Sequence, residues 1–165
     1  MERVVFTEEM RKTHTILIPT MLPTHFKMIA QILCSYGYKA EVLENTGRQV
    51  IDNGLKYVHN DACYPSLLII GQFIDALKSG KYDPHKVALL YAQTGGGCRA
   101  SNYIALLRKA LVKAGFEYVP VISLNLTGLE ENPGFKLTLP ILHRMVYAAM
   151  YGDLIMLLRN QCVPY

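Results

Sequence analysis

The strongest chemical signal in the sequence is Cys98, which directly follows Gly95, Gly96 and Gly97. Glycines let the backbone turn sharply and approach a ligand closely. A helix is expected to begin at Cys98, and the amino end of a helix offers free N–H groups and partial positive charge, which favour a thiolate. Arg99 adds a positive neighbour. Cys98 is therefore a candidate nucleophile or metal ligand; the alternative is a small residue packed under the loop.

A second cysteine, Cys63, stands directly before another expected helix, residues 64–79, with Pro65 in its first turn. The next strand, 87–92, is expected to run parallel to the first strand of the sheet. The helix must then run from the carboxyl edge of the sheet back to the amino edge. This direction predicts that Cys63 and Cys98 converge on one crevice; the alternative for Cys63 is a small buried residue.

The other sulfur, imidazole and phenol side chains carry weaker signals. Cys34 lies on an apolar stretch and is expected in the core, whereas Cys162 is expected to be an exposed thiol at a helix end. Without a Cys-x-x-Cys pair, zinc-ribbon and thioredoxin sites have no support. The tyrosines are expected to serve packing. The histidines have no His-x-x-x-His pair and are expected in loops or on the surface: His14, His25, His59, His85 and His143.

Strand-like and helix-like segments alternate along the chain, in the order β-α-β-α-α-β-α-β-α. This order predicts an α/β fold of three layers: a four-stranded, mainly parallel sheet, Rossmann-like or flavodoxin-like with strand order 2-1-3-4, and helices on both faces. Ligands of such sheets sit outside the carboxyl ends of the strands. The expected strands are 15–19, 39–43, 87–92 and 119–124, and the expected helices are 24–36 (capped by Thr24), 47–58, 64–79, 98–114 and one after Gly134.

Composition narrows the class of protein. The chain has 165 residues, predicted to form a single α/β domain over 1–165, with 51% hydrophobic and 18% charged residues and a net charge of +4. Disorder and a nucleic-acid partner are therefore not expected. With no signal peptide, we expect a cytoplasmic protein with reduced thiols. The apolar stretch 137–158 contains Asp153 and is interpreted as a buried or interface helix rather than a membrane span.

The chain resembles the family of 2-hydroxyacyl-CoA dehydratases and CoA-substrate-specific enzyme activase-related proteins over nearly its whole length. The two most specific pieces are Asp61-Ala62-Cys63-Tyr64-Pro65 and Thr94-Gly95-Gly96-Gly97-Cys98-Arg99. Further similar pieces are Thr13-His14-Thr15-Ile16-Leu17-Ile18-Pro19, Pro120-Val121-Ile122-Ser123-Leu124-Asn125, Asn132-Pro133-Gly134-Phe135-Lys136 and Tyr151-Gly152-Asp153-Leu154. Members of this family are long chains, so the resemblance implies an excised dehydratase-subunit-like module of a larger multidomain chain.

The resemblance also implies a function. Cys63 and Cys98 match cysteines that bind an iron–sulfur cluster, here a 4Fe–4S cluster whose third ligand lies outside this piece. The module would support electron transfer or radical dehydration of an acyl-CoA in a lyase system; the alternative is a non-catalytic nucleotide- or CoA-binding module or an interdomain docking module. Candidate ligand-binding residues are Thr94, Gly95, Gly96, Gly97, Arg99 and Asn102.

The same resemblance implies the partners of the module. These are other modules of the same chain, including an activase ATPase module, and an acyl-CoA. The ATPase motifs themselves are absent from this piece. The apolar helix 137–158 is a candidate surface for a homodimer, whereas neither a nucleic acid nor a membrane is expected as a partner.

Overall fold

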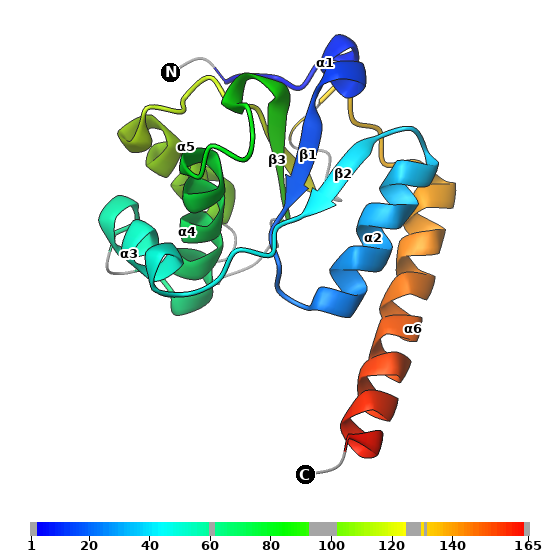
Figure 1. The fold of residues 1–165 in the computed structure, drawn as a ribbon. Coiled ribbons are helices and arrows are strands. Elements are labelled where there is room, and N and C mark those ends of the chain that lie inside the picture. Colours follow the sequence, from blue (N-terminus) through cyan, green and yellow to red (C-terminus); the bar gives the residue numbers. More distant parts are fainter. Residues whose placement is uncertain (1–2, 60–61, 93–101, 125–129, 131, 164–165) are drawn as a thin grey trace.

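The structure is a computed structural model that describes residues 3–59, 62–92, 102–124, 130 and 132–163. Helices and strands alternate along the chain (Figure 1). The strands are β1 (Thr15–Ile18), β2 (Lys39–Val42), β3 (Val87–Ala92) and β4 (Val121–Leu124). The helices are α1 (Glu8–Thr13), α2 (Pro23–Ser35), α3 (Arg48–Tyr57), α4 (Tyr64–Lys78), the short 3-10 helix η1 (Pro84–Lys86), α5 (Tyr103–Ala114) and α6 (Leu139–Cys162).

The strands of the described residues form one parallel sheet in the order β2-β1-β3-β4. Ile16 of β1 lies in register with Ala40 of β2 and with Ala88 of β3. The predicted fold class, with its strand order 2-1-3-4, is therefore confirmed. Central strand β3 is buried along its first five residues, which explains why its sequence is apolar without alternation.

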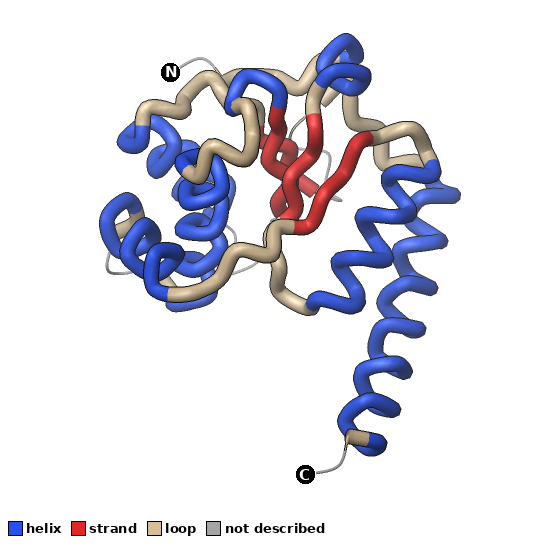
Figure 2. The backbone as a smooth tube through the Cα atoms, viewed as in Figure 1, coloured by secondary structure: helices blue, strands red, loops and turns tan. Residues whose placement is uncertain are grey.

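Helices cover both faces of the sheet (Figure 2). On one face, α4 and α5 pack on side chains such as Leu17 and Leu89, and α3 lies against α4. On the other face, α2 and α6 cover the neighbouring side chains Ile16, Ala88 and Ile122. Successive residues of a strand point to opposite faces, so each strand contributes to both halves of the core.

Local chemistry at the helix ends explains where the structure departs from the sequence predictions. Thr24 is not the cap of α2: Leu22 occupies the cap position and Pro23 the first turn, where a missing N–H costs nothing. The predicted end of this helix is right, because Gly37 adopts a positive φ of 83°. Helices α1 and η1 were not predicted, and neither buries a residue.

The long last helix, α6, is mostly exposed. Only Ile141, Ala148 and Gly152 are buried along its 24 residues, so the reading of a buried helix is wrong. An interface helix stays a prediction. By length and composition alone α6 could cross a membrane, and only 17% of that apolar window is buried against the rest of the protein.

Candidate functional site

Cys63 occupies the cap position at the amino end of α4, where it is half-buried. Its Sγ lies 2.6 Å from Oη of Tyr103, the first residue of α5, within hydrogen-bond distance. Because α5 follows β3 in the chain, this contact places Cys63 at the carboxyl edge of the sheet. This is the edge that the direction of α4 requires, and it is where parallel α/β sheets bind ligands.

A buried tyrosine, Tyr91, packs against this pair. The ring of Tyr91, near the carboxyl end of β3, stacks on the ring of Tyr103, with centroids 5.5 Å apart and planes 4° from parallel. The same ring makes an edge-to-face contact with Phe73 of α4, with centroids 6.3 Å apart. Burial raises the pKa of the Tyr91 hydroxyl, and the neighbouring Tyr103 and Cys63 raise it further. Tyr91 therefore stays a neutral phenol at physiological pH.

Three hydroxyls around this site have no hydrogen-bond partner among the described residues. They are Oη of Tyr91, Oγ of Ser123, which lies in register with Tyr91 on β4, and Oγ of Ser66, in the first turn of α4. All three side chains are buried, with exposed fractions of 3%, 8% and 0%. A buried hydroxyl without a partner is costly.

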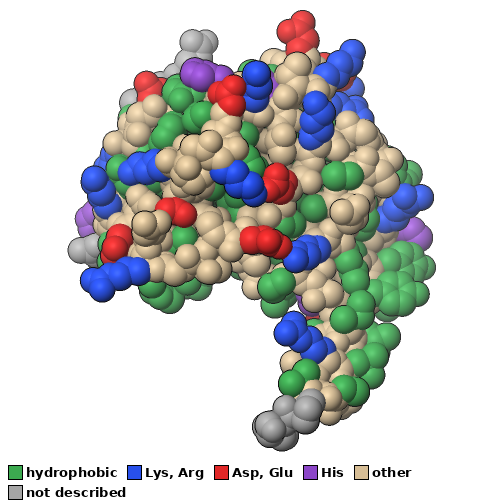
Figure 3. Space-filling model, viewed as in Figure 1, with side chains coloured by type: hydrophobic (Ala, Val, Ile, Leu, Met, Phe, Trp, Pro, Cys, Tyr) green, Lys and Arg blue, Asp and Glu red, His purple; other side chains and the backbone are tan. Residues whose placement is uncertain are grey.

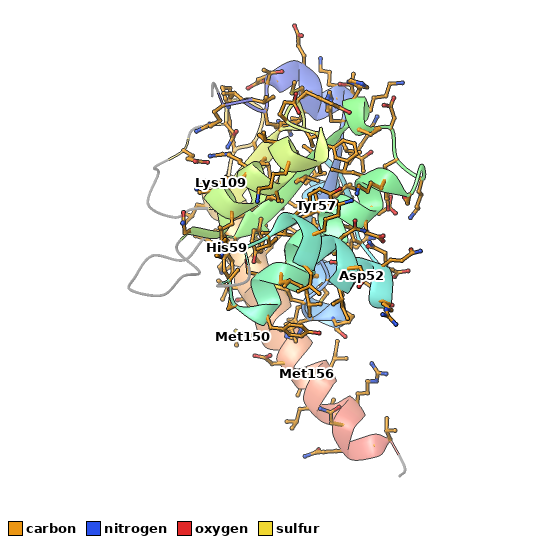
Figure 4. The ribbon with its side chains drawn as sticks, turned by 90° about the vertical axis from the view of Figure 1, so that its left-hand side faces the viewer. Asp52, Tyr57, His59, Lys109, Met150 and Met156 are labelled. Atoms are coloured by element: carbon orange, nitrogen blue, oxygen red, sulfur yellow. The ribbon has the colours of Figure 1, made fainter. Side chains whose placement is uncertain are left out.

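A close helix contact fixes where α4 presents Cys63. Helices α3 and α4 touch backbone to backbone at Gly54 and Gly71, and a Cβ added to Gly71 would lie 2.1 Å from the carbonyl oxygen of Val50. Figure 4 views this side of the molecule, with Asp52 and Tyr57 of α3 and His59 just beyond the end of that helix. The expected weak helix 47–58 is thus a well-packed support for α4.

Most of the other predicted site residues lie outside the described part of the chain. Cys98, the run Thr94, Gly95, Gly96 and Gly97, and Arg99 lie outside the described residues. Asn102 precedes α5 at the cap position, is exposed and makes no side-chain cap hydrogen bond. The convergence of Cys63 and Cys98 therefore stays a prediction.

Two predictions about single side chains are wrong. Cys34 is exposed rather than in the core, because its Sγ lies at the rim of the sheet, 3.6 Å from the carbonyl oxygen of Ala40 in the edge strand β2. His25 is buried rather than at the surface, and its Nε2 lies 2.9 Å from Oδ1 of Asp153 on α6. Cys162 is exposed at the end of α6, as predicted.

The donor set for a metal or cluster is incomplete in the described part of the chain. No group of three or more His, Cys, Asp or Glu side chains gathers there. Cys63 offers a thiol, which is the right kind of ligand for an iron–sulfur cluster, but such a cluster takes several thiolates. The residues that the structure describes therefore do not by themselves fit a cluster.

The two tyrosines of this site were not predicted as functional residues. Tyr91 and Tyr103 were expected to serve packing only. Their signal was positional: Tyr91 stands one residue before the end of the clearest strand, and Tyr103 follows the glycine-rich loop after that strand. Both positions belong to the carboxyl edge, where a phenol can meet a ligand or another functional side chain.

Comparison of the chain with protein-family models, with curated proteins and with solved structures finds no match. The resemblance stated above therefore rests on the quoted residues alone.

Proposed function

We propose that this domain is an iron–sulfur-associated module of a cytoplasmic 2-hydroxyacyl-CoA dehydratase/activase-like system. Its role is to support electron transfer or radical dehydration of an acyl-CoA within a lyase assembly. Cys63 and Cys98 are the ligands it contributes to a 4Fe–4S cluster, and the remaining ligands come from other modules. The observation that carries the proposal is the position of Cys63, beside Tyr103 at the carboxyl edge of the sheet.

Tyr103 gives the proposed ligand a tuning group. Hydrogen bonds to cluster sulfurs are one of the means by which a protein sets reduction potential. The Tyr103 hydroxyl lies 2.6 Å from the Cys63 sulfur and is positioned to donate to it. Tyr91, stacked beneath, holds the Tyr103 ring in place.

Anaerobic reconstitution tests this function. The protein is incubated with iron and sulfide, desalted, and assayed for bound iron and for a visible charge-transfer band. We expect iron to bind when the wild type is combined with its partner modules, which supply the remaining ligands, and to be lost when Cys63→Ala or Cys98→Ala takes its place. Cys162→Ala is the matched control, because this thiol is exposed at the far end of α6. Absence of iron from the wild type, also in the presence of its partner modules, would exclude the proposal.

A second candidate function is the binding of a nucleotide or CoA without redox chemistry. The unpartnered hydroxyls of Ser66 and Tyr91 favour it, because they lie near a helix amino end that can accept an anionic group. Titration calorimetry with CoA and with nucleotides checks it. Flat traces would reject this alternative, and heat that persists in Cys63→Ala would favour it over the cluster.

A further inference from the structure

The two faces of α6 differ in what covers them. Ile141, Ala148 and Gly152 are its buried residues, and their spacing of seven and four places them on one side of the helix. This side lies against α2. Gly152 fits most closely, since a Cβ there would lie 2.4 Å from the ring of His25. Figure 1 shows α6 continuing past the beginning of α2 and away from the body of the protein.

The opposite side of α6 carries an apolar stripe. At about 100° per residue, the positions that lie roughly opposite Gly152 are Tyr147, Met150, Leu154 and Leu157. These four side chains are 47%, 63%, 48% and 54% exposed. We call them the α6 seam. Figure 4 labels Met150 of the seam, and Figure 3 shows apolar side chains gathered along the projecting part of the helix.

The spacing of the seam indicates what covers it. Its residues are separated by three, four and three positions, which is the repeat by which one helix packs along another in a coiled coil. The amount of surface is also comparable with that of an interface. Seven large apolar side chains on or beside the seam are 47–63% exposed: Val146, Tyr147, Met150, Tyr151, Leu154, Leu157 and Leu158. With on the order of 150–200 Å² for each full side chain, they offer roughly 650 Å², against the 800 Å² or so that each partner buries in a stable interface.

A lipid bilayer fits this surface less well than a helix does. The packing of α2 reaches α6 as far as Asp153, which contacts His25 in the first turn of α2. Beyond it, Leu154 to Cys162 extend about 14 Å, less than half of the roughly 30 Å of a hydrocarbon core. Arg159 lies within this short segment and Asp153 at its beginning.

We propose that the α6 seam is a dimerisation surface whose partner is the α6 seam of a second copy of this chain. The two helices run antiparallel, so that their dipoles oppose each other. In this register Tyr147 faces the partner's Leu157, and Met150 faces the partner's Leu154. The contact is isologous and closes on itself, as most homodimers do. The inference is independent of the proposed function, because it involves neither cysteine of the site.

The molar mass in solution tests this dimer. Light scattering coupled to gel filtration, over a wide dilution series, should find the wild type as a dimer. Leu154→Glu places a charge in the seam and should raise the dissociation constant by about 100-fold or more, as for an interface hot spot. Leu55→Glu on α3 is the matched control, because Leu55 is 52% exposed and lies outside the seam. It should leave the dimer intact. Circular dichroism of each variant verifies that it is folded.

The register is tested by complementary charges. Met150→Lys and Leu154→Glu should each be monomeric, whereas an equal mixture of the two should form a heterodimer, because the substituted positions face each other only between unlike copies. A monomeric wild type, or a Leu154→Glu variant that still dimerises, would overturn the proposal. A monomeric wild type that floats with uncharged phosphatidylcholine vesicles would instead assign the seam to a membrane.

Discussion

Two helix pairs flank the sheet, and they differ in how many residues of their central helix are buried. In the pair of α3 and α4, ten of the fifteen residues of α4 are buried, because the sheet, α3 and α5 all pack around it. In the pair of α2 and α6, three of the twenty-four residues of α6 are buried. Each pair nevertheless has a glycine at its closest approach: Gly71 in the first and Gly152 in the second.

This difference shows that apolar composition alone does not tell which surface covers a helix. Both α4 and α6 are rich in Leu, Ile and aromatic residues. The neighbours that bury α4 all come from this chain. The described part of the chain supplies α6 with a neighbour on one side only, at α2, and its seam faces outward. Substitutions matched between the two helix pairs test this difference in burial.

The largest effect is expected at the two glycines. In Gly71→Ala the new Cβ would meet backbone atoms, at 2.1 Å from the Val50 oxygen, so α3 must move away; we expect a loss of about 4 kcal/mol of unfolding free energy. In Gly152→Ala the Cβ meets only the ring of His25, which can shift, so we expect a loss of about 1–2 kcal/mol. Urea denaturation followed by circular dichroism measures both, and equal losses would contradict the difference between the pairs.

Truncation of matched aliphatic side chains should have the next largest effect. Ile70 of α4 is fully buried, so Ile70→Ala should cost about 3 kcal/mol through lost burial and the cavity left behind. Leu157 of α6 is 54% exposed, so at high dilution Leu157→Ala should change the free energy of unfolding by less than about 0.5 kcal/mol.

Protein concentration sharpens the same test. If the α6 seam pairs with a second copy, Leu157→Ala should lose stability relative to the wild type as the concentration rises. Denaturation midpoints at two concentrations measure this change. A large loss for Leu157→Ala at high dilution would mean that α6 is covered within one chain.

The smallest effect is expected for an ion pair of α5, on the face of the sheet that α4 and α5 cover. Arg108 donates two hydrogen bonds of 2.8 Å to the Glu130 carboxylate and holds the pKa of that carboxyl below 4.5. A depressed pKa gives stability that is present above pH 4.5 and is lost as the pH falls through the folded-state value. The free energy of unfolding of the wild type should therefore exceed that of Glu130→Gln by less than about 1 kcal/mol near neutral pH. This difference should vanish in acid. Glu9→Gln, at an exposed position, is the control, and a difference that persists in acid would contradict this origin.

The elements and their order could be read from local sequence, because strands such as 87–92 are apolar without alternation and glycines such as Gly37 and Gly115 end the helices. Helix α1 also had a local signal, since Thr7 accepts from the Met10 N–H and acidic residues follow it. The burial of His25 had none. It depends on Gly152, 127 positions later in the chain, which leaves room for the imidazole.

For the candidate site, chain direction was enough to place Cys63 at the carboxyl edge, because a helix that leads into a parallel strand must start there. The partner of its sulfur could not be found in this way. Tyr103 reaches Cys63 only because its ring is stacked on Tyr91, and such a stack depends on how the end of β3 and the start of α5 are packed together.

Gly152 also sets the rotational phase of α6. By admitting the His25 ring at one point, it decides which angular sector of the helix turns toward α2 and therefore which sector turns outward. Insertion of one residue between Leu139 and Gly152 would rotate everything beyond it by about 100° relative to the start of the helix. If Gly152 kept its place against His25, the anchoring Ile141 would leave its pocket instead. The length of this segment is thus as constrained as its composition.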